Sequence, residues 1–284
     1  MNILTFDIED WYHILDNDST KTINEWSRYE NRIHRNIELI FSVLEKHNVR
    51  ASFFCLGWIA EKYPEIIRKI DKMGYEIGSH SYMHQLVYEQ NKYVFKKDTE
   101  KSVKIIEDIT GKKVRIYRAP GFSITESTLW ALEVLIELDI EIDCSVFPAK
   151  RAHGGFPSYG KGESCIFNIN GLTIKEFPIN IHTFLSKNII FSGGGYFRLL
   201  PYLLIKNFSE KSNYIMTYFH PRDFDPMQPI IKDLPLSRKF KSYTGLKSAL
   251  SKLDKYINDF SFTDISTADK SIDWNKVKVI DISL

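Results

Sequence analysis

Residues 1–18, MNILTFDIEDWYHILDND, place three acidic side chains directly after a short apolar run. Apolar and β-branched residues crowd positions 3–8, and a short run of this kind predicts a buried strand. Asp7, Glu9 and Asp10 stand where this strand ends. A buried carboxylate is costly unless its charge is compensated. The stretch therefore predicts a metal, an arginine or a chemical step at this point.

The rest of the chain alternates between strand-like and helix-like stretches, which predicts an α/β fold with parallel strands and crossover helices. Residues 31–48, 63–74 and 126–139 are expected to be helices, and Gly74 is placed to end the second. Seven strands fit the alternation better than eight, so we expect a single domain built as a distorted (β/α)7 barrel. The strand-like runs are residues 2–8, 49–57, 75–81, 114–120, 141–148, 173–180 and 214–220.

The composition is that of a globular protein with a substantial core. The 284 residues are 43% hydrophobic and 26% charged. The net charge is only +2, so no overall electrostatic field favours nucleic acid or anionic lipid. Three widely spaced cysteines are expected to be free thiols: Cys55, Cys144 and Cys165. The N-terminus lacks a signal-peptide pattern and no run of about 18 apolar residues occurs, which predicts a cytoplasmic protein without a membrane span.

Two segments are expected to form loops on the substrate side of the domain. Residues 150–170 are rich in Gly, Ser and Lys, and residues 192–201, SGGGYFRLLP, form a second loop that opens a helix. Long structured loops in compact domains are often functional. We therefore assign 150–200 to the substrate side of one domain spanning 1–284, and expect the polar tail 262–284 to wrap the surface.

The strand-like runs end on residues that carry chemistry. His80 and His84 follow the third run, Arg118 lies in the fourth and His220 ends the last. In a parallel barrel the carboxyl ends of the strands converge on one face, where the active site is built. Two histidines and one carboxylate leave coordination positions open on a divalent metal, as in catalytic sites. These residues are therefore expected to meet the N-terminal acids in one pocket.

Five segments, in this order, resemble the motifs of NodB-homology polysaccharide deacetylases, carbohydrate esterase family four. They are TFDIED (5–10), HSYMH (80–84), RAPGF (118–122), DCSVFP (143–148) and YFHP (218–221). Together they extend over most of the chain. The first motif, of the DVED type, and the GGGYFR segment make the chain similar to the branch associated with surface-polysaccharide biosynthesis clusters.

The resemblance implies a role for each matching residue. Asp7 would be the general base, and Arg118 would hold and orient it. His80 and His84 would be metal ligands, and His220 would be the general acid. Elementary chemistry supports these roles, because a metal acidifies bound water, an arginine keeps a carboxylate ionised, and a protonated histidine can protonate a leaving amine.

Four further residues are expected to contact the substrate. The resemblance implies that the loop with Gly121 and Phe122 offers a backbone N–H group to the oxyanion. Tyr196 is expected to stack on a sugar ring, and Arg198 to bind a phosphate or a carboxylate.

The sequence leaves the identity of the carboxylate ligand open. Strand alternation puts Asp7 and Glu9 on one face, whereas Asp10 has to reach round from the strand end. Related branches with a D-x-D spacing favour Glu9, and the usual choice of a short aspartate favours Asp10. Asp223 or Asp225 could orient the nearby histidine, or could only form a turn.

The expected function is metal-dependent removal of the N-acetyl, or another small N-acyl, group from an amino sugar in a polysaccharide or its precursor. Zn²⁺ is the expected metal, with Co²⁺, Ni²⁺ or Mn²⁺ as alternatives on the same ligands. A second hypothesis is a metal-free amidohydrolase acting on a ureide ring, although such relatives lack the metal ligands present here. The third is an inactive sugar-binding protein. The expected partner is an N-acetylated amino sugar or oligosaccharide, not nucleic acid, and the oligomeric state is open.

Overall fold

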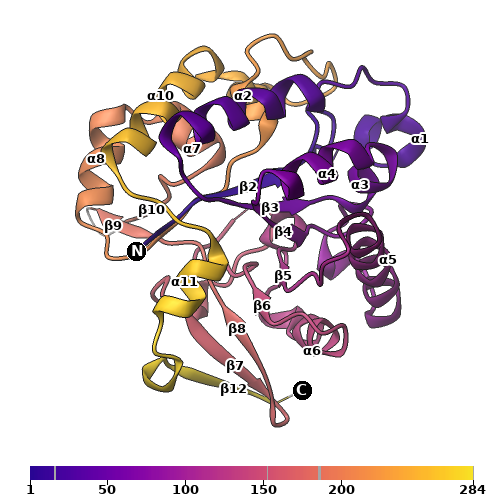
Figure 1. Cartoon of the computed structure of the whole chain (residues 1–284), viewed down its shortest axis with the longest axis vertical. Coiled ribbons are helices and arrows are strands. Elements are labelled where there is room, and N and C mark those ends of the chain that lie inside the picture. Colours follow the sequence, from indigo (N-terminus) through magenta and orange to yellow (C-terminus); the bar gives the residue numbers. More distant parts are fainter. Residues whose placement is uncertain (16, 152, 185–186, 284) are drawn as a thin grey trace.

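The computed structural model describes residues 1–15, 17–151, 153–184 and 187–283, and it has the α/β fold that the alternation predicts. Strands lie at the centre and helices pack around them (Figure 1). Each of the seven predicted runs contains a strand in parallel pairing, so the single-domain α/β prediction is confirmed. The strands are β1 (Asn2–Ile3) with β2 (Thr5–Ile8), β3 (Ser52–Cys55), β4 (Glu76–Ser79), β5 (Ile116–Tyr117), β6 (Ile142–Asp143), β8 (Leu172–Glu176) and β11 (Ile215–Met216).

The barrel is open at one seam. Within the described residues, the main sheet has eight strands in the order β12-β7-β8-β6-β5-β4-β3-β2. Its neighbours are parallel except for β7 (Cys165–Ile169), which is antiparallel to β8. On the far side of the N-terminal segment, β11 pairs with β1. No ladder between described strands joins β8 to β11, because the free edge of β8 is taken by β7.

The N-terminal strand has a neighbour on each side, which fixes the direction of its acidic side chains. Asp7 of β2 lies opposite Phe54 of β3, and on the other side its N–H donates to the Phe219 carbonyl at 2.7 Å. All four residues of β2 are buried. Because side chains alternate along a strand, Asp7 and Glu9 point to the same side.

One part of the sequence-based prediction is wrong and another is incomplete. Residues 165–169, expected in a loop, form β7, and the tail adds α11 (Ile265–Ser271) and β12 (Val279–Ile282), which pairs with β7. The β7–β8 hairpin turns at Asn170 and Gly171, both with positive φ, as a tight two-residue hairpin turn requires. In addition, β9 (His182–Phe184) pairs antiparallel with β10 (Lys187–Ile189).

The three predicted helices are confirmed as α2 (Ile33–His47), α4 (Pro64–Lys72) and α6 (Trp130–Glu137), and Gly74 has the expected positive φ beyond α4. The longest helix, α5, was not predicted, because Thr99 and Ser102 interrupt its buried face. Ser102 faces Gly57 so closely that a Cβ on Gly57 would lie 2.8 Å from it. The other helices are α1 (Ile23–Trp26), α3 (Gly57–Lys62), α5 (Lys92–Thr110), α7 (Gly194–Leu199), α8 (Tyr202–Glu210), α9 (Leu236–Tyr243) and α10 (Leu246–Asp259).

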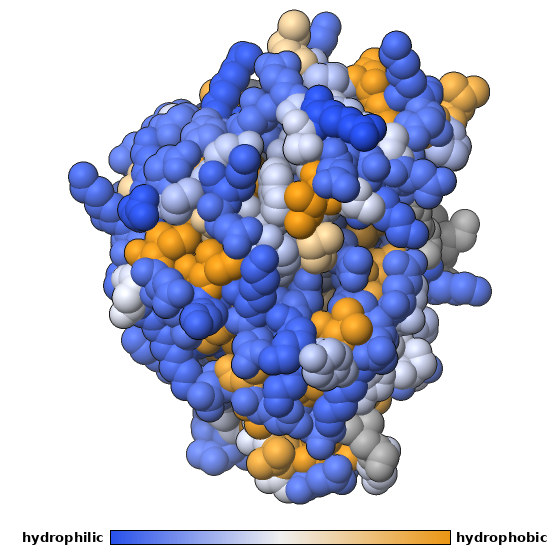
Figure 2. All heavy atoms as spheres, turned by 90° about the vertical axis from the view of Figure 1, so that its right-hand side faces the viewer, coloured by the Kyte–Doolittle hydropathy of each residue, from blue (hydrophilic) through white to orange (hydrophobic). Residues whose placement is uncertain are grey.

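The surface is largely polar. Figure 2 shows the face at the right of Figure 1, where hydrophilic side chains predominate and apolar ones gather in separate small patches. Among the described residues, no helix is both long enough and apolar enough to cross a bilayer.

Candidate active site

A carboxylate and two imidazoles form a candidate metal centre. Glu9 Oε1 lies 2.9 Å from His80 Nε2 and 2.8 Å from His84 Nε2, and all three side chains are buried. Their ligand atoms lie within 4.8 Å of one another. Burial opposes ionisation of Glu9, but the charges of His84 and His220 and hydrogen bonds from both ligand histidines outweigh it and hold its pKa well below the ordinary value.

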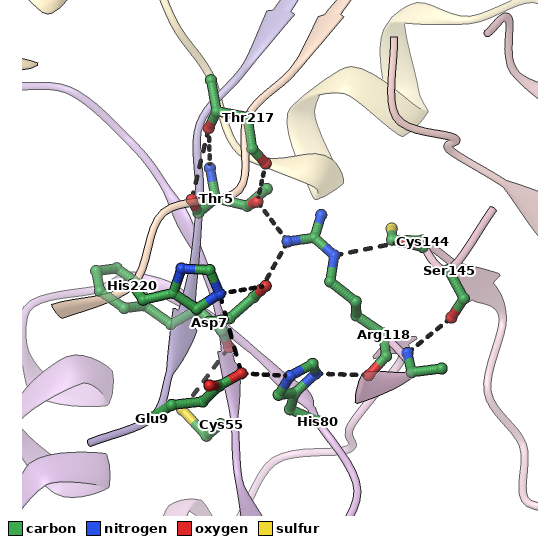
Figure 3. Close-up of polar contacts among 12 residues, drawn as sticks. Thr5, Asp7, Glu9, Cys55, His80, Arg118, Cys144, Ser145, Thr217 and His220 are labelled. Atoms are coloured by element: carbon green, nitrogen blue, oxygen red, sulfur yellow. Dashed lines mark hydrogen bonds and ion pairs between the residues drawn. The ribbon is translucent and has the colours of Figure 1, made fainter. Parts of the chain in front are cut away.

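The donor chemistry fits a divalent metal. His80 Nδ1 lies 2.7 Å from the Arg118 carbonyl oxygen, which can only accept a hydrogen bond (Figure 3). The Nδ1 atom must therefore carry a proton, so in a neutral imidazole the lone pair of Nε2 faces the Glu9 carboxylate. Two acceptors that face each other need a cation between them. A backbone carbonyl that fixes the tautomer in this way is typical of metal-ligating histidines.

The turn from His80 to His84 is strained and is braced by a carboxylate. Ser81 and His84 have φ of 62° and 53°, in the left-handed region that non-glycine residues seldom adopt. The carboxylate of Asp98, on α5, accepts hydrogen bonds from the N–H groups of Tyr82 and Met83 at 2.7 and 2.9 Å. This brace holds the second imidazole towards Glu9.

Asp10, the alternative ligand, points away from the imidazoles. Its carboxylate accepts hydrogen bonds from the backbone N–H groups of Trp11, Arg32 and Ile33 at 2.8, 2.9 and 3.1 Å. The last two begin α2, so Asp10 caps that helix. Burial raises its pKa to about 6 in spite of these bonds. The structure thus brings Glu9, and not Asp10, to the histidines.

Asp7 and Arg118 form a buried ion pair beside this centre. Arg118 Nη1 lies 2.7 Å from Asp7 Oδ1 and donates to Thr5 Oγ1 at the same distance, while Nε donates to the Cys144 carbonyl at 3.2 Å. Figure 3 shows the guanidinium between these groups. Arg118 is fully buried over the Phe54 ring. Asp7 is therefore held at one oxygen, and its other oxygen faces His220.

His220 lies across from the acids and is itself oriented by a carboxylate. Its Nε2 atom is 3.8 Å from Asp7 Oδ2 and 4.0 Å from Glu9 Oε1. Its Nδ1 atom lies 3.0 Å from Asp223 Oδ2. Burial opposes its protonation, but the Asp223 hydrogen bond and the charges of Glu9, Asp223 and Asp7 raise its pKa to about 9. A protonated His220 is what a general acid requires.

Arg198, expected to bind substrate, is instead part of the framework. It is 6% exposed, and its Nε lies 2.9 Å from Asp223 Oδ1. Its Nη atoms donate to the carbonyls of Lys241, Ser242 and Thr244 at 2.9–3.0 Å. The guanidinium thus links the end of α9 to the carboxylate that orients the histidine. Burial raises the pKa of Asp223, but Arg198 and His220 outweigh it and lower that pKa to about 2.

We therefore expect R198Q to act on turnover and not on substrate binding. Loss of the guanidinium frees Asp223 from one side and loosens His220, so kcat should fall roughly tenfold to a hundredfold while KM changes little. R198K should restore part of kcat through the ion pair. Steady-state kinetics will check this. A rise in KM with unchanged kcat would instead indicate that Arg198 binds the substrate.

The other expected substrate contacts, Gly121, Phe122 and Tyr196, differ in their exposure. Gly121 has φ of 62°, and a Cβ there would come within 2.9 Å of Leu15 and Leu86. The Phe122 N–H donates to the Ala119 carbonyl at 3.1 Å, so it is already paired and not free for an oxyanion. The Phe122 ring is buried. Tyr196, on α7, is 49% exposed.

A pocket of 320 Å³ adjoins the metal centre on the His84 side. Gln85 and Leu86 continue its wall from His84, and Trp26, which is only 2% exposed, also borders it. Its remaining lining comes mostly from the loop after the N-terminal strand: Ile14, Leu15, Asn17, Asp18, Thr20 and Lys21, with Glu89 opposite. The pocket mixes an aromatic ring with polar groups, as a sugar subsite would.

Asp143 supports the site from beneath the sheet. Ser145 Oγ donates to Asp143 Oδ1 at 2.5 Å and accepts from the Ala119 N–H at 2.8 Å, which ties the Arg118 loop to β6. Burial raises the pKa of Asp143, and burial and the Asp143 carboxyl raise that of Glu176 well above its ordinary value.

This acid pair predicts a pH-dependent stability. A carboxyl whose folded pKa is raised stabilises the fold fully below its unfolded pKa, and that contribution is lost as pH rises towards the folded pKa. The free energy of unfolding should therefore decline between pH 5 and pH 8, and E176Q should reduce the decline. Urea unfolding at pH 5 and pH 8 measures this change in the free energy of unfolding. E163Q, which replaces an exposed glutamate, is the control. If the free energy of unfolding of E176Q declined as much as that of the unchanged protein, Glu176 would not be the group responsible.

Fold and site together define a class, namely α/β barrel proteins with a two-histidine, one-carboxylate candidate metal centre flanked by an aspartate–arginine pair and a histidine–aspartate pair. Residues 4–136 match the family described as polysaccharide deacetylase, and residues 144–270 match one described as a domain of unknown function, DUF3473. Residues 4–136 are therefore similar to polysaccharide deacetylases.

Several curated relatives are deacetylases that resemble part of the chain. A peptidoglycan-N-acetylglucosamine deacetylase from Bacillus cereus is 36% identical over 95 residues, covering 33% of this chain and 34% of that protein. A peptidoglycan deacetylase from Helicobacter pylori is 27% identical over 123 residues, covering 43% and 39%. A chitooligosaccharide deacetylase from Azorhizobium caulinodans is 30% identical over 82 residues, covering 28% and 39%. The chain thus spans less than two fifths of each of these relatives.

Solved structures share the fold. A protein from Mycobacterium smegmatis assigned as a polysaccharide deacetylase has a TM-score of 0.66 at 15% identity, covering 99% of this chain and 93% of that chain. A carbohydrate esterase family 4 pseudoenzyme from Bacillus anthracis has a TM-score of 0.51 at 13% identity, covering 94% and 64%. Because this fold also occurs in a pseudoenzyme, activity has to be argued from the residues of the site.

Proposed function

We propose that the protein is a metal-dependent carbohydrate N-deacetylase. The observation that carries the proposal is that the candidate metal ligands Glu9, His80 and His84 lie next to two further polar groups. One is Asp7, which is paired with Arg118, and the other is His220, which is paired with Asp223. The similarity to known deacetylases supports the same reaction class. Zn²⁺ is the proposed metal, since imidazole and carboxylate ligands with open positions suit it.

The side chains divide the reaction between them. Glu9, His80 and His84 would hold the metal, which when bound polarises the amide carbonyl and acidifies water. The free oxygen of Asp7 takes the proton of the attacking water, while Arg118 holds the carboxylate in place. His220 donates its Nε2 proton to the departing nitrogen, so that the sugar amine leaves as a neutral group.

We further propose that the substrate is an N-acetylated amino sugar in a surface-polysaccharide precursor. The 320 Å³ pocket beside His84 has room for about one or two sugar rings, which supports a short substrate. The exposed Tyr196 on α7 would stack on a sugar ring of this substrate.

The decisive experiment is acetate release from nucleotide-linked, lipid-linked and polymeric N-acetyl sugars, with and without a chelator. The proposal expects acetate from at least one precursor, its loss with chelator and its return with Zn²⁺. Activity that survives chelation would favour the metal-free hypothesis. Sugar binding without acetate release from any substrate would favour an inactive binding protein.

A further inference from the structure

The segment between the catalytic histidine and α10 exposes large apolar side chains that the fold does not use. Met227, Ile230, Leu236 and Phe240 are 69%, 60%, 83% and 60% exposed. Single exposed apolar residues are ordinary, but four within fourteen positions indicate a surface that something covers. We name residues 226–243 the rim segment.

Polar contacts, and not burial of these side chains, hold the rim segment in place. Helix α9 within it has no buried residue, and Leu236 and Phe240, four positions apart, share its outer face. Its end is fixed by Arg198 through backbone carbonyls, and the Ile231 N–H donates to Tyr243 Oη at 2.9 Å. The exposed apolar side chains are therefore not needed to keep the helix on the protein.

The rim segment is also strongly basic. It contains Lys232, Arg238, Lys239 and Lys241 against a single acid, Asp233, which gives 4 − 1 = +3. The whole chain carries only +2, so the remainder is slightly acidic. In the described part of the chain, none of the three lysines takes part in an ion pair with an acidic side chain. The small net charge therefore conceals a local positive surface.

We propose that the rim segment docks the protein on an anionic lipid surface. Apolar side chains on one helix face, surrounded by basic residues, are the arrangement with which peripheral proteins lie in the interfacial layer of a bilayer without spanning it. Each Lys or Arg near such a surface adds attraction to acidic headgroups. A second copy of the same segment is the poorer occupant, because two segments of charge +3 would face each other.

The rim segment lies close to the candidate active site, so docking would also affect which substrates can reach that site. It begins six residues after His220, and Arg238 donates to the carbonyl of Leu15, which lines the 320 Å³ pocket. The segment crosses the top of the view in Figure 1. A docked protein would hold this pocket close to the bilayer, as a lipid-linked sugar requires. This consequence, unlike the docking, rests on the proposed function.

Vesicle binding tests the docking without any assay of activity. The full chain is mixed with phosphatidylcholine vesicles with or without 30% phosphatidylglycerol, and the bound fraction is measured by flotation at low and high salt. We expect binding to the anionic vesicles that weakens with salt. L236Q/F240Q should weaken it about a hundredfold, roughly tenfold for each apolar side chain. K232Q/K239Q/K241Q should also weaken it about a hundredfold, roughly fivefold for each charge.

Matched variants control for general surface changes. L203Q removes a leucine that is 77% exposed on α8, and K104Q removes an exposed lysine of α5; both should bind vesicles as the unchanged protein does. Circular dichroism confirms that each variant is folded. Equal affinity for neutral and anionic vesicles, or equal loss in L203Q, would overturn the proposal. So would a dimer in sedimentation that L236Q/F240Q dissociates.

Discussion

Replacing Glu9 by glutamine is expected to abolish metal binding, while replacing its neighbour Asp10 by asparagine leaves the metal in place. Glu9 Oε1 faces both ligand histidines, and an amide is a much poorer ligand than a carboxylate. Loss of a residue that only hydrogen-bonds to a metal ligand typically lowers metal affinity by about 10- to 100-fold. Because Glu9 would itself be a ligand, metal affinity in E9Q should fall by more than about 100-fold. Elemental analysis after dialysis and a competitive Zn²⁺ titration measure this.

The adjacent D10N is the matched control, since it removes the same charge one position away. It should lose stability, by about 1 kcal/mol, because it weakens the cap of α2. Urea unfolding measures that loss. A metal-free D10N beside a metal-loaded E9Q would reverse the assignment of the two carboxylates.

D7N is expected to keep the metal and to lose most turnover. Base catalysis typically contributes about 10²–10⁴-fold, and the amide cannot accept the proton of water. Acetate release with the metal content measured on the same sample checks this. A D7N protein that has shed its metal would make Asp7 chiefly a ligand.

The same substitution should also destabilise the fold, because it leaves the fully buried guanidinium of Arg118 facing a neutral group. Removal of one partner of a buried pair costs about 3–5 kcal/mol, here less because Thr5 and the Cys144 carbonyl remain as partners. The double variant D7N/R118M should recover stability without recovering turnover. Recovery of both would contradict a role for Asp7 in the reaction.

The sequence predicted the parts of the site that strand ends determine. A short apolar run marks each strand, and the ends of parallel strands converge on one face. These two facts predicted that the site contains Asp7, His80, Arg118 and His220. The choice between Glu9 and Asp10 could not be made, because it depends on where the chain goes after Ile8. The Asp10 carboxylate is used by α2, which begins more than twenty residues later.

Arg198 shows a second limit. Its neighbours in GGGYFR predicted a loop open to substrate, but its partners are carbonyls more than forty residues away. Such convergence has no local sequence pattern. By contrast, the β7–β8 hairpin could have been predicted, since Asn170-Gly171 between two alternating stretches is a strong hairpin signal. The cytoplasmic location stays a prediction.

Arg118 serves the site through two chemically independent parts. Its carbonyl oxygen fixes the His80 tautomer, and its guanidinium holds Asp7. Any amino acid at this position keeps the carbonyl, so one substitution can end turnover while metal loading survives. A natural lineage could thus pass from catalyst to idle metal protein in a single mutational step. Among homologues, possession of bound metal is therefore weak evidence of activity, and the side chain at this position is the better marker.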